Sequence, residues 1–174
     1  MEAANLKMQE GNTLGAIKDY TSALAIDPTL VDAYYGRGSV FAELLTYDKA
    51  LADFNKAIEL DSSIAIAFFN RGVVYNAKGY HKLAITDFNR YVKMRPKDPQ
   101  GYLARAEYYQ QQGLQALADQ DYKKVSGLEP IDADGYVSRS EVKLILGDTA
   151  GAIDDISMCI EKKPQYTKAY LFRA

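Results

Sequence analysis

The sequence predicts an all-α fold, a right-handed solenoid of stacked antiparallel helix pairs, because one pattern returns every 34 residues. Its clearest copy is Ala33-Tyr34-Tyr35-Gly36-Arg37-Gly38. The arginine of this stretch recurs at the same interval, at Arg71, Arg105, Arg139 and Arg173. A period of this length indicates supersecondary units that bury their apolar faces by stacking on their neighbours.

The repeat that spans 31–64 reads as two helices. Tyr34, Arg37, Gly38 and Phe41 fall at i, i+3, i+4 and i+7, which predicts a first helix from about residue 32 to residue 45. Apolar residues at helical spacing then predict a second helix that ends near residue 61. In the next two repeats a glycine suited to a helix C-terminus marks the turn, at Gly79 and Gly113.

The boundaries of the repeats follow from the period. We expect one array over residues 1–174, with a partial first unit 1–30, full units 31–64, 65–98, 99–132 and 133–166, and an incomplete last helix 167–174. Proline, which ends a helix, stands just past the second helix at Pro28, Pro96, Pro130 and Pro164. The last segment is apolar, so we expect a longer array or a covering chain; the alternative is a naturally short last helix.

Small residues alternate with large ones in a way that predicts close helix packing. The first helices carry a small residue at Ala4, Gly38, Gly72, Ala106, Ser140 and Ala174. The second helices carry alanine at Ala16, Ala50, Ala84, Ala118 and Ala152. We expect the large residues, such as Phe54 and Phe88, to fill the spaces between the helices.

The composition excludes several classes of function. A net charge of −2 gives no basic field for a nucleic acid. His81 is the only histidine and Cys159 the only cysteine, so we expect neither a metal site nor a cofactor, and Cys159 reads as a buried apolar residue rather than a reactive thiol. No serine has a nearby general base, which argues against an enzyme. No signal pattern or bilayer-length apolar run is present, and the compartment stays open.

The period and its positions together resemble the tetratricopeptide repeat. Counted within each unit, the pattern has an aromatic residue at place four, a small one at eight, an aromatic at eleven, alanine at twenty, Phe or Tyr at twenty-four and proline near thirty-two. The resemblance covers essentially the whole chain. It implies an interaction module for another protein.

A second set of charged residues also recurs every 34 residues, and we interpret it with the arginines as a ladder of ion pairs. A half-buried cation needs a countercharge, and the aspartate of the preceding unit is the expected partner, Asp19 for Arg37 and Asp53 for Arg71. The alternative is a strip of arginines that binds an anion. The ladder comprises Asp19, Arg37, Asp53, Arg71, Asp87, Arg105, Asp121, Arg139, Asp155 and Arg173.

The resemblance further implies that the first helices line a concave groove for a partner segment. The positions that match groove positions of the family include Asp32, Tyr35, Ser39, Glu43, Ile66, Phe69, Val73, Asn76, Leu103, Glu107, Gln110, Val137 and Glu141. Apolar residues flanked by acids suit an extended or helical segment with apolar anchors, with or without a basic residue.

Family members that bind chaperones hold the partner's terminal carboxylate with a clamp of Lys, Asn and Arg. Tyr35, Ser39, Asn70 and Leu103 stand at clamp places here, so we expect no such clamp. Two hypotheses stay open: a scaffold or adaptor that docks a partner segment in the groove, and a structural spacer or self-association segment whose exposed terminal helices stack on another copy.

Overall fold

The computed structural model describes residues 2–173, apart from the side chains of Asn5, Gln9 and Arg173. All regular elements in that range are α-helices, and the chain divides into two compact units, residues 1–94 and 95–174. The N-terminal unit contains α1 (Glu2–Gln9), α2 (Thr13–Ile26), α3 (Val31–Glu43), α4 (Tyr47–Leu60), α5 (Ala65–Ala77) and α6 (His81–Met94). The C-terminal unit contains α7 (Pro99–Gln111), α8 (Gln115–Ser126), α9 (Ala133–Ile145), α10 (Thr149–Lys162) and α11 (Thr167–Arg173).

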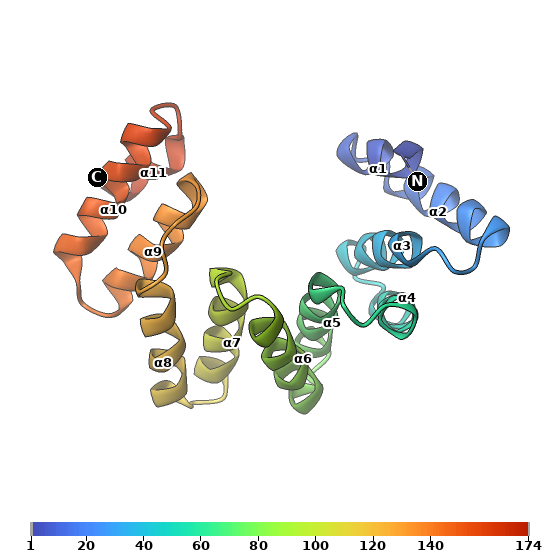
Figure 1. Cartoon of the computed structure of the whole chain (residues 1–174), viewed down its shortest axis with the longest axis horizontal. Helices are drawn as coiled ribbons and strands as arrows, with labels where there is room; N and C mark the ends of the chain where they lie inside the picture. The colour runs from blue at the N-terminus through green and yellow to red at the C-terminus, as the bar shows by residue number, and fades with distance from the viewer. Residues whose placement is uncertain (1, 174) are drawn as a thin grey trace. The chain divides into compact units, whose positions relative to one another are not determined.

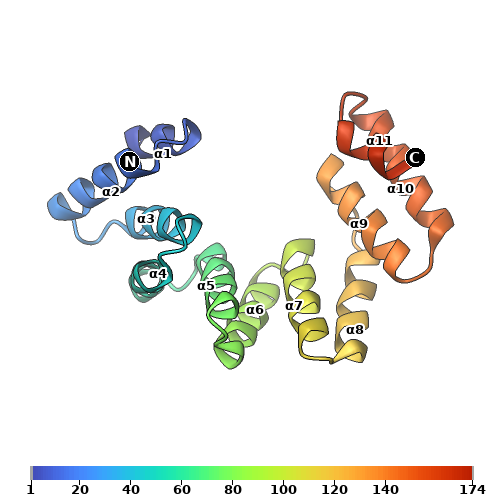
Figure 2. The ribbon, with the colours of Figure 1, turned by 180° about the vertical axis from the view of Figure 1, so that it is seen from behind.

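Consecutive helices pack as antiparallel pairs, as the sequence predicts (Figures 1 and 2). The pairs are α1 with α2, α3 with α4, α5 with α6, α7 with α8, and α9 with α10. Neighbouring pairs within one unit stack through α2 on α3, α4 on α5 and α8 on α9, and α10 packs on α11. The predicted solenoid of helix pairs is confirmed.

A residue in the left-handed region of backbone space ends the first helix of each pair. Gly11, Gly79, Gly113 and Gly147 have φ between 71° and 84°, and Leu45 takes this place in α3 with φ 56°. Glycine adopts such angles without strain, whereas the Cβ of leucine approaches a carbonyl oxygen. The turn after α3 is therefore the strained one of the five.

The predicted small residues are buried or lie in close contact with the facing helix. Ala16, Ala50, Ala84, Ala118 and Ala152 are all buried. A Cβ built on Gly38 would lie 3.0 Å from the Phe54 ring, and one on Gly72 would lie 2.9 Å from the Phe88 ring. These aromatic rings fill the space that the glycines leave, which confirms the predicted packing.

Leu45→Gly is expected to stabilise the protein, by about 1 kcal/mol, because it removes the left-handed strain. The Leu45 side chain is 69% exposed, so its loss costs little burial. Leu44→Gly, next to it with φ −79°, is the control and is expected to destabilise. Urea unfolding checks both variants, and a loss of stability in Leu45→Gly would contradict the strain argument.

Candidate functional site

Four buried arginine–aspartate pairs tie the helices of single pairs together. In each, Nε and an Nη of the arginine donate to the two carboxylate oxygens, at 2.5–2.8 Å. The aspartate side chains are only 3–7% exposed and the arginines 16–19%. The pairs are Arg37–Asp53, Arg71–Asp87, Arg105–Asp121 and Arg139–Asp155.

These partners differ from those that the sequence predicts, so the predicted register is wrong. Arg37 pairs with Asp53 of its own repeat rather than with Asp19, and Arg71 with Asp87 rather than with Asp53. The reason is the antiparallel turn, because residues equally far from it lie side by side. Arg37 and Asp53 are each eight residues from Leu45, and the other three pairs flank Gly79, Gly113 and Gly147 in the same way.

The ion pairs of the predicted ladder therefore join the two helices of one repeat. They do not join an aspartate to the arginine of the next repeat. The last arginine of the ladder, Arg173, has a side chain outside the described residues. By the same count from Gly11, the residue of α1 that corresponds to Asp19 is Ala3, which offers no cation, and Asp19 instead accepts from Lys7 Nζ at 2.6 Å. One further turn of α1 thus supplies the charge that the arginine supplies elsewhere.

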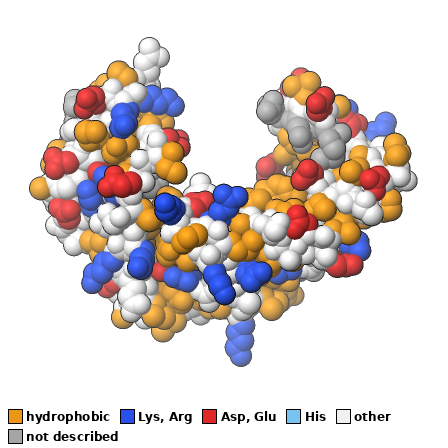
Figure 3. All heavy atoms as spheres, viewed as in Figure 1, with side chains coloured by type: hydrophobic (Ala, Val, Ile, Leu, Met, Phe, Trp, Pro, Cys, Tyr) orange, Lys and Arg blue, Asp and Glu red, His pale blue; other side chains and the backbone are white. Residues whose placement is uncertain are grey.

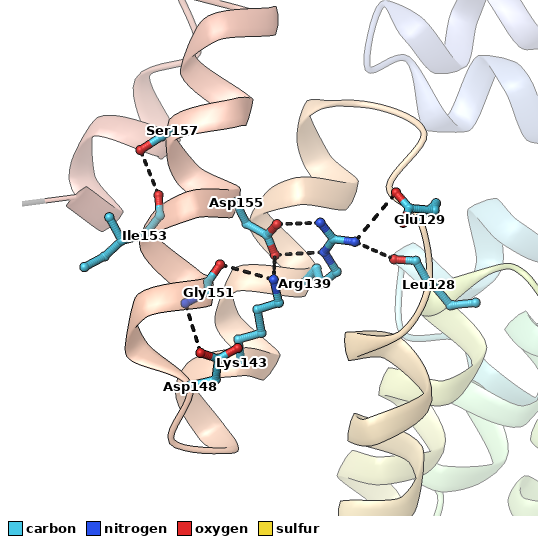
Figure 4. A network of polar contacts seen from close by, with 9 residues as sticks. All are labelled: Leu128, Glu129, Arg139, Lys143, Asp148, Gly151, Ile153, Asp155 and Ser157. Carbon is cyan, nitrogen blue, oxygen red and sulfur yellow. Dashed lines mark hydrogen bonds and ion pairs between the residues drawn. The ribbon is translucent and has the colours of Figure 1, made fainter.

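Asp155 has two cationic partners (Figure 4). Lys143 Nζ lies 3.0 Å from the carboxylate, and Arg139 completes the pair. Burial acts to raise the pKa of Asp155, but hydrogen bonds from Arg139 and Lys143 outweigh it and hold that pKa below the ordinary value. This carboxylate is therefore ionised at neutral pH, as a structural pair requires.

The remaining arginine donor reaches the preceding helix pair. Arg37 Nη1 donates to Thr21 Oγ1 at 3.1 Å, and Arg71 Nη1 to Asn55 Oδ1 at 2.8 Å. Arg139 Nη1 donates to the Leu128 carbonyl at 2.9 Å. These arginines therefore do connect successive repeats, but not through the predicted aspartates. Arg37 and Arg71 use neutral side-chain acceptors, and Arg139 adds an ion pair at 3.9 Å with the exposed Glu129 to its contact with the Leu128 carbonyl.

The groove residues of the N-terminal unit lie on α3 and α5, whose neighbouring positions form what we call the first-helix face. It comprises Asp32, Tyr35, Ser39 and Glu43 of α3 and Ile66, Phe69, Val73 and Asn76 of α5. Figure 3 shows hydrophobic, acidic and basic side chains together on the side of the molecule that faces the viewer. The structure thus brings these eight predicted residues onto two adjacent helices.

Two aromatic residues of this face are held in place from behind. Asn70 Nδ2 donates to the Tyr35 hydroxyl at 3.1 Å, and the Tyr35 ring lies 6.2 Å from that of Phe54. The Phe69 ring lies 5.0 Å from Tyr91. Both rings are half-buried, so they present a preorganised edge and not a freely rotating side chain.

Charge on this face is acidic. Asp32 and Glu43 are exposed, and neither has an ion pair with another described residue. Ser39 donates to the Tyr35 carbonyl at 3.0 Å, and Val73 is 45% exposed. The face is therefore apolar in the middle, with a carboxylate near each end of α3.

In the C-terminal unit the predicted residues behave differently. Leu103 is half-buried, Glu107 is exposed, and Gln110 accepts from the Tyr122 hydroxyl at 2.9 Å. Val137, which the sequence predicts to face a partner, is fully buried. Its short side chain packs within a cluster that includes Ile156, Cys159 and Ala169, so it cannot contact a partner.

Both acidic side chains of α9 have an ion-pair or hydrogen-bond partner within the chain. Lys168 Nζ lies 3.6 Å from Glu141 Oε1, and the Tyr166 hydroxyl donates to Asp134. This hydrogen bond raises the pKa of Tyr166 to about 12. The first-helix positions of α9 are therefore less available than those of α3 and α5.

Other candidate chemistry is sparse in the part of the chain that the structure describes. No group of three or more His, Cys, Asp or Glu residues within residues 2–173 is arranged to hold a metal ion. Cys159 is buried, its Sγ–H donates to the Ala133 carbonyl, and burial raises its pKa, which keeps the thiol protonated. Within the described range, no helix has the length and apolar character needed to cross a bilayer.

Comparison with protein families gives two overlapping matches. A model described as "TPR repeat" matches residues 4–44 and 46–79, and one described as "Tetratricopeptide repeat" matches residues 65–98. The chain belongs to the tetratricopeptide repeat family. A comparison with curated proteins returns no match.

Solved tetratricopeptide repeat structures share this fold. TTC0263 from Thermus thermophilus has a TM-score of 0.72 at 16% identity, covering 98% of this chain and 93% of its own. YrrB, described as having an unusual peptide-binding site, has a TM-score of 0.65 at 22% identity, with 98% and 88% covered. The first repeat domain of Spaghetti (RPAP3), bound to the HSP90 peptide SRMEEVD, has a TM-score of 0.63 at 24% identity, with 64% and 89% covered.

Family and fold support a role as a protein–protein interaction scaffold. Tetratricopeptide repeats are in general non-catalytic, and they act by presenting surfaces to other proteins. The arginine–aspartate pairs belong to the architecture of such a scaffold. The first-helix face is the remaining candidate for recognition.

A double-mutant cycle tests the arginine–aspartate pairs of the tetratricopeptide array. Arg71→Met is expected to cost about 3 kcal/mol, because it leaves the Asp87 carboxylate buried without a countercharge. Asp87→Leu is expected to cost less, because Arg71 is partly exposed. Combining the two changes should cost less than the sum of the single costs.

Asn55→Ala removes only the contact of Arg71 with the preceding pair and is expected to cost under about 1 kcal/mol. Chemical denaturation measures the free energies of unfolding of the wild type and of these four variants. A coupling energy of zero between Arg71 and Asp87 would show that the pair contributes no specific stability.

Proposed function

We propose that the protein is a non-catalytic scaffold that docks an extended or helical segment of a partner protein on the first-helix face of its N-terminal unit. The observation that carries this is the pair of half-buried rings, Tyr35 and Phe69, on neighbouring first helices. Rigid aromatic residues at the centre of a surface supply most of the binding energy in protein interfaces. Val73 extends the apolar centre and is 45% exposed.

The C-terminal unit offers a separate apolar position at Leu103, which we assign to the same type of contact. It is half-buried on α7 and lies beside the exposed Glu107 in the pattern of first-helix positions. The peptide-bound domain of Spaghetti and the peptide-binding site described for YrrB support a protein segment as the occupant.

We further propose that recognition does not use a carboxylate clamp. Clamp chemistry requires lysine and arginine donors for a terminal carboxylate. The first-helix face instead presents Asp32 and Glu43, and the Asn70 amide donates to the Tyr35 hydroxyl. An anionic chain terminus would meet repulsion at this surface.

The double variant Tyr35→Ala, Phe69→Glu is expected to lose partner capture in a pull-down by more than about tenfold, because it removes one aromatic anchor and places a charge at the other. Tyr80→Ala, Leu83→Glu is the matched control, since these residues are exposed on another part of the same unit. Thermal melting confirms that both variants are folded. Equal capture by the two variants would contradict the proposal.

Self-association is the second candidate, favoured by an exposed apolar run in α11. Tyr170, Leu171 and Phe172 are 41%, 75% and 38% exposed. An apolar helix face of this kind can stack on a second copy of the chain, as repeats stack within an array. This function would leave the first-helix face unused.

Leu171→Glu is expected to convert an oligomer of the chain to a monomer, because it places a charge in the apolar contact. Ile131→Glu, at a residue 89% exposed in the connection before α9, is the control and should leave the oligomer intact. Light scattering measures the molar mass. A wild-type chain that is a monodisperse monomer at high concentration would rule out this candidate.

A further inference from the structure

Two carboxylates of the first-helix face have no ion-pair partner among the described residues. Asp32 lies in the first turn of α3 and Glu43 in its last turn, and both are exposed. Eleven steps of α-helix separate them, which places their Cα atoms about 16 Å apart and within about 20° of each other around the helix axis. They therefore lie along one line of the helix, at its two ends.

The chain itself shows how an acid at such a position is satisfied when its donor is internal. Asp134 of α9 stands at the place in its repeat that Asp32 occupies in α3, and it accepts from the Tyr166 hydroxyl. The residue equivalent to Tyr166 in the N-terminal unit is Ile64, whose side chain has no donor to offer. Asp32 thus keeps the carboxylate but lacks the internal partner.

Glu43 is unfavourable for the helix that carries it. The C-terminal end of a helix dipole is negative, so a carboxylate there costs about 0.3–1 kcal/mol. The last turn of α3 contains no basic residue that would offset this, and no ion pair joins Glu43 to another described residue. A carboxylate at this place destabilises the free protein slightly.

The surface between these acids is apolar and uncharged. Tyr35 and the neighbouring Phe69 are half-buried, and Val73 of α5 is 45% exposed. Ser39, which lies between the acids on α3, already donates to a backbone carbonyl. Asp32 and Glu43 are therefore the two charged side chains that this face presents to a partner.

We infer that the partner segment is a cationic one, with two basic residues that flank an apolar centre and meet Asp32 and Glu43. This inference rests on the proposed function of the same face. Charge complementarity selects the occupant, since an acidic segment would face two uncompensated carboxylates. A separation of about 16 Å corresponds to about five residues of an extended segment or about eleven of a helix.

The test uses a displayed library of random peptides, selected on the full chain and long enough to span both acids. Enriched peptides are synthesised with a fluorescent label and their dissociation constants are measured by anisotropy at low and high salt. The expected peptides carry Lys or Arg on both sides of apolar residues, and their affinity falls as salt is added, because exposed charges are screened.

Asp32→Asn combined with Glu43→Gln is expected to weaken binding of these peptides about fivefold, the size of two exposed charge pairs. Asp48→Asn combined with Glu59→Gln is the matched control: it changes the net charge equally, on exposed residues of α4, and should bind as the wild type. Glu43→Gln alone should raise the melting temperature or leave it unchanged, which separates its role in binding from a role in folding.

Selected peptides without basic enrichment, or equal binding by the Asp32→Asn, Glu43→Gln variant and the wild type, would overturn the inference. If Tyr35→Ala, Phe69→Glu still abolishes peptide binding in that case, the proposed docking face stands and only the cationic partner fails. If neither variant weakens binding, the docking face fails as well.

Discussion

The close approach of the two helices in each pair is the constraint on which the other features depend. It is set by alanine on the second helix, as at Ala50 and Ala84, and by glycine on the first, as at Gly38 and Gly72. At this separation an aromatic ring fills the remaining space, and a carboxylate on the second helix lies within direct reach of an arginine on the first. A larger residue at either glycine would push the facing aromatic ring out of place, and the Arg–Asp geometry would be lost with it.

Arginine suits this position because its planar group makes three useful contacts at once. Two donors bind the buried aspartate and the third reaches the preceding pair, as Arg71 does with Asp87 and Asn55. Lysine can supply charge but not the fork. Accordingly, Lys7 serves Asp19, whereas Lys143 supplements Arg139 at Asp155. The same arginine side chain thus holds a hairpin together and contacts the hairpin before it.

The period of the sequence is sufficient to predict the helices, their pairing and their small-residue contacts, because each depends on local spacing. The predicted ion-pair partners are wrong, since a 34-residue period fits either neighbouring aspartate equally well. The turn distinguishes them: Arg37 and Asp53 are equally far from Leu45, and this spacing is present in the sequence. The burial of Val137, in contrast, cannot be predicted from such a spacing. It depends on tertiary packing, because the Val137 side chain is shorter than that of Tyr35 or Phe69 and lies in a cluster with Ile156 and Ala169.

Recognition and stability place opposite demands on the residues between these fixed positions. The repeating residues, such as Arg37 and Gly38, are determined by contacts inside the array and leave no freedom for a partner. The residue that follows each recurring aromatic is not constant among the repeats, and where it is an accessible aromatic, as at Tyr35 and Phe69, its ring packs against the second helix of its own hairpin. Glu43 goes further, since it sits where the helix dipole disfavours it and where the described chain gives it no cation. Glu43 thus weakens its own helix and gains no compensating contact with the described residues, which is why we propose that it contacts a partner.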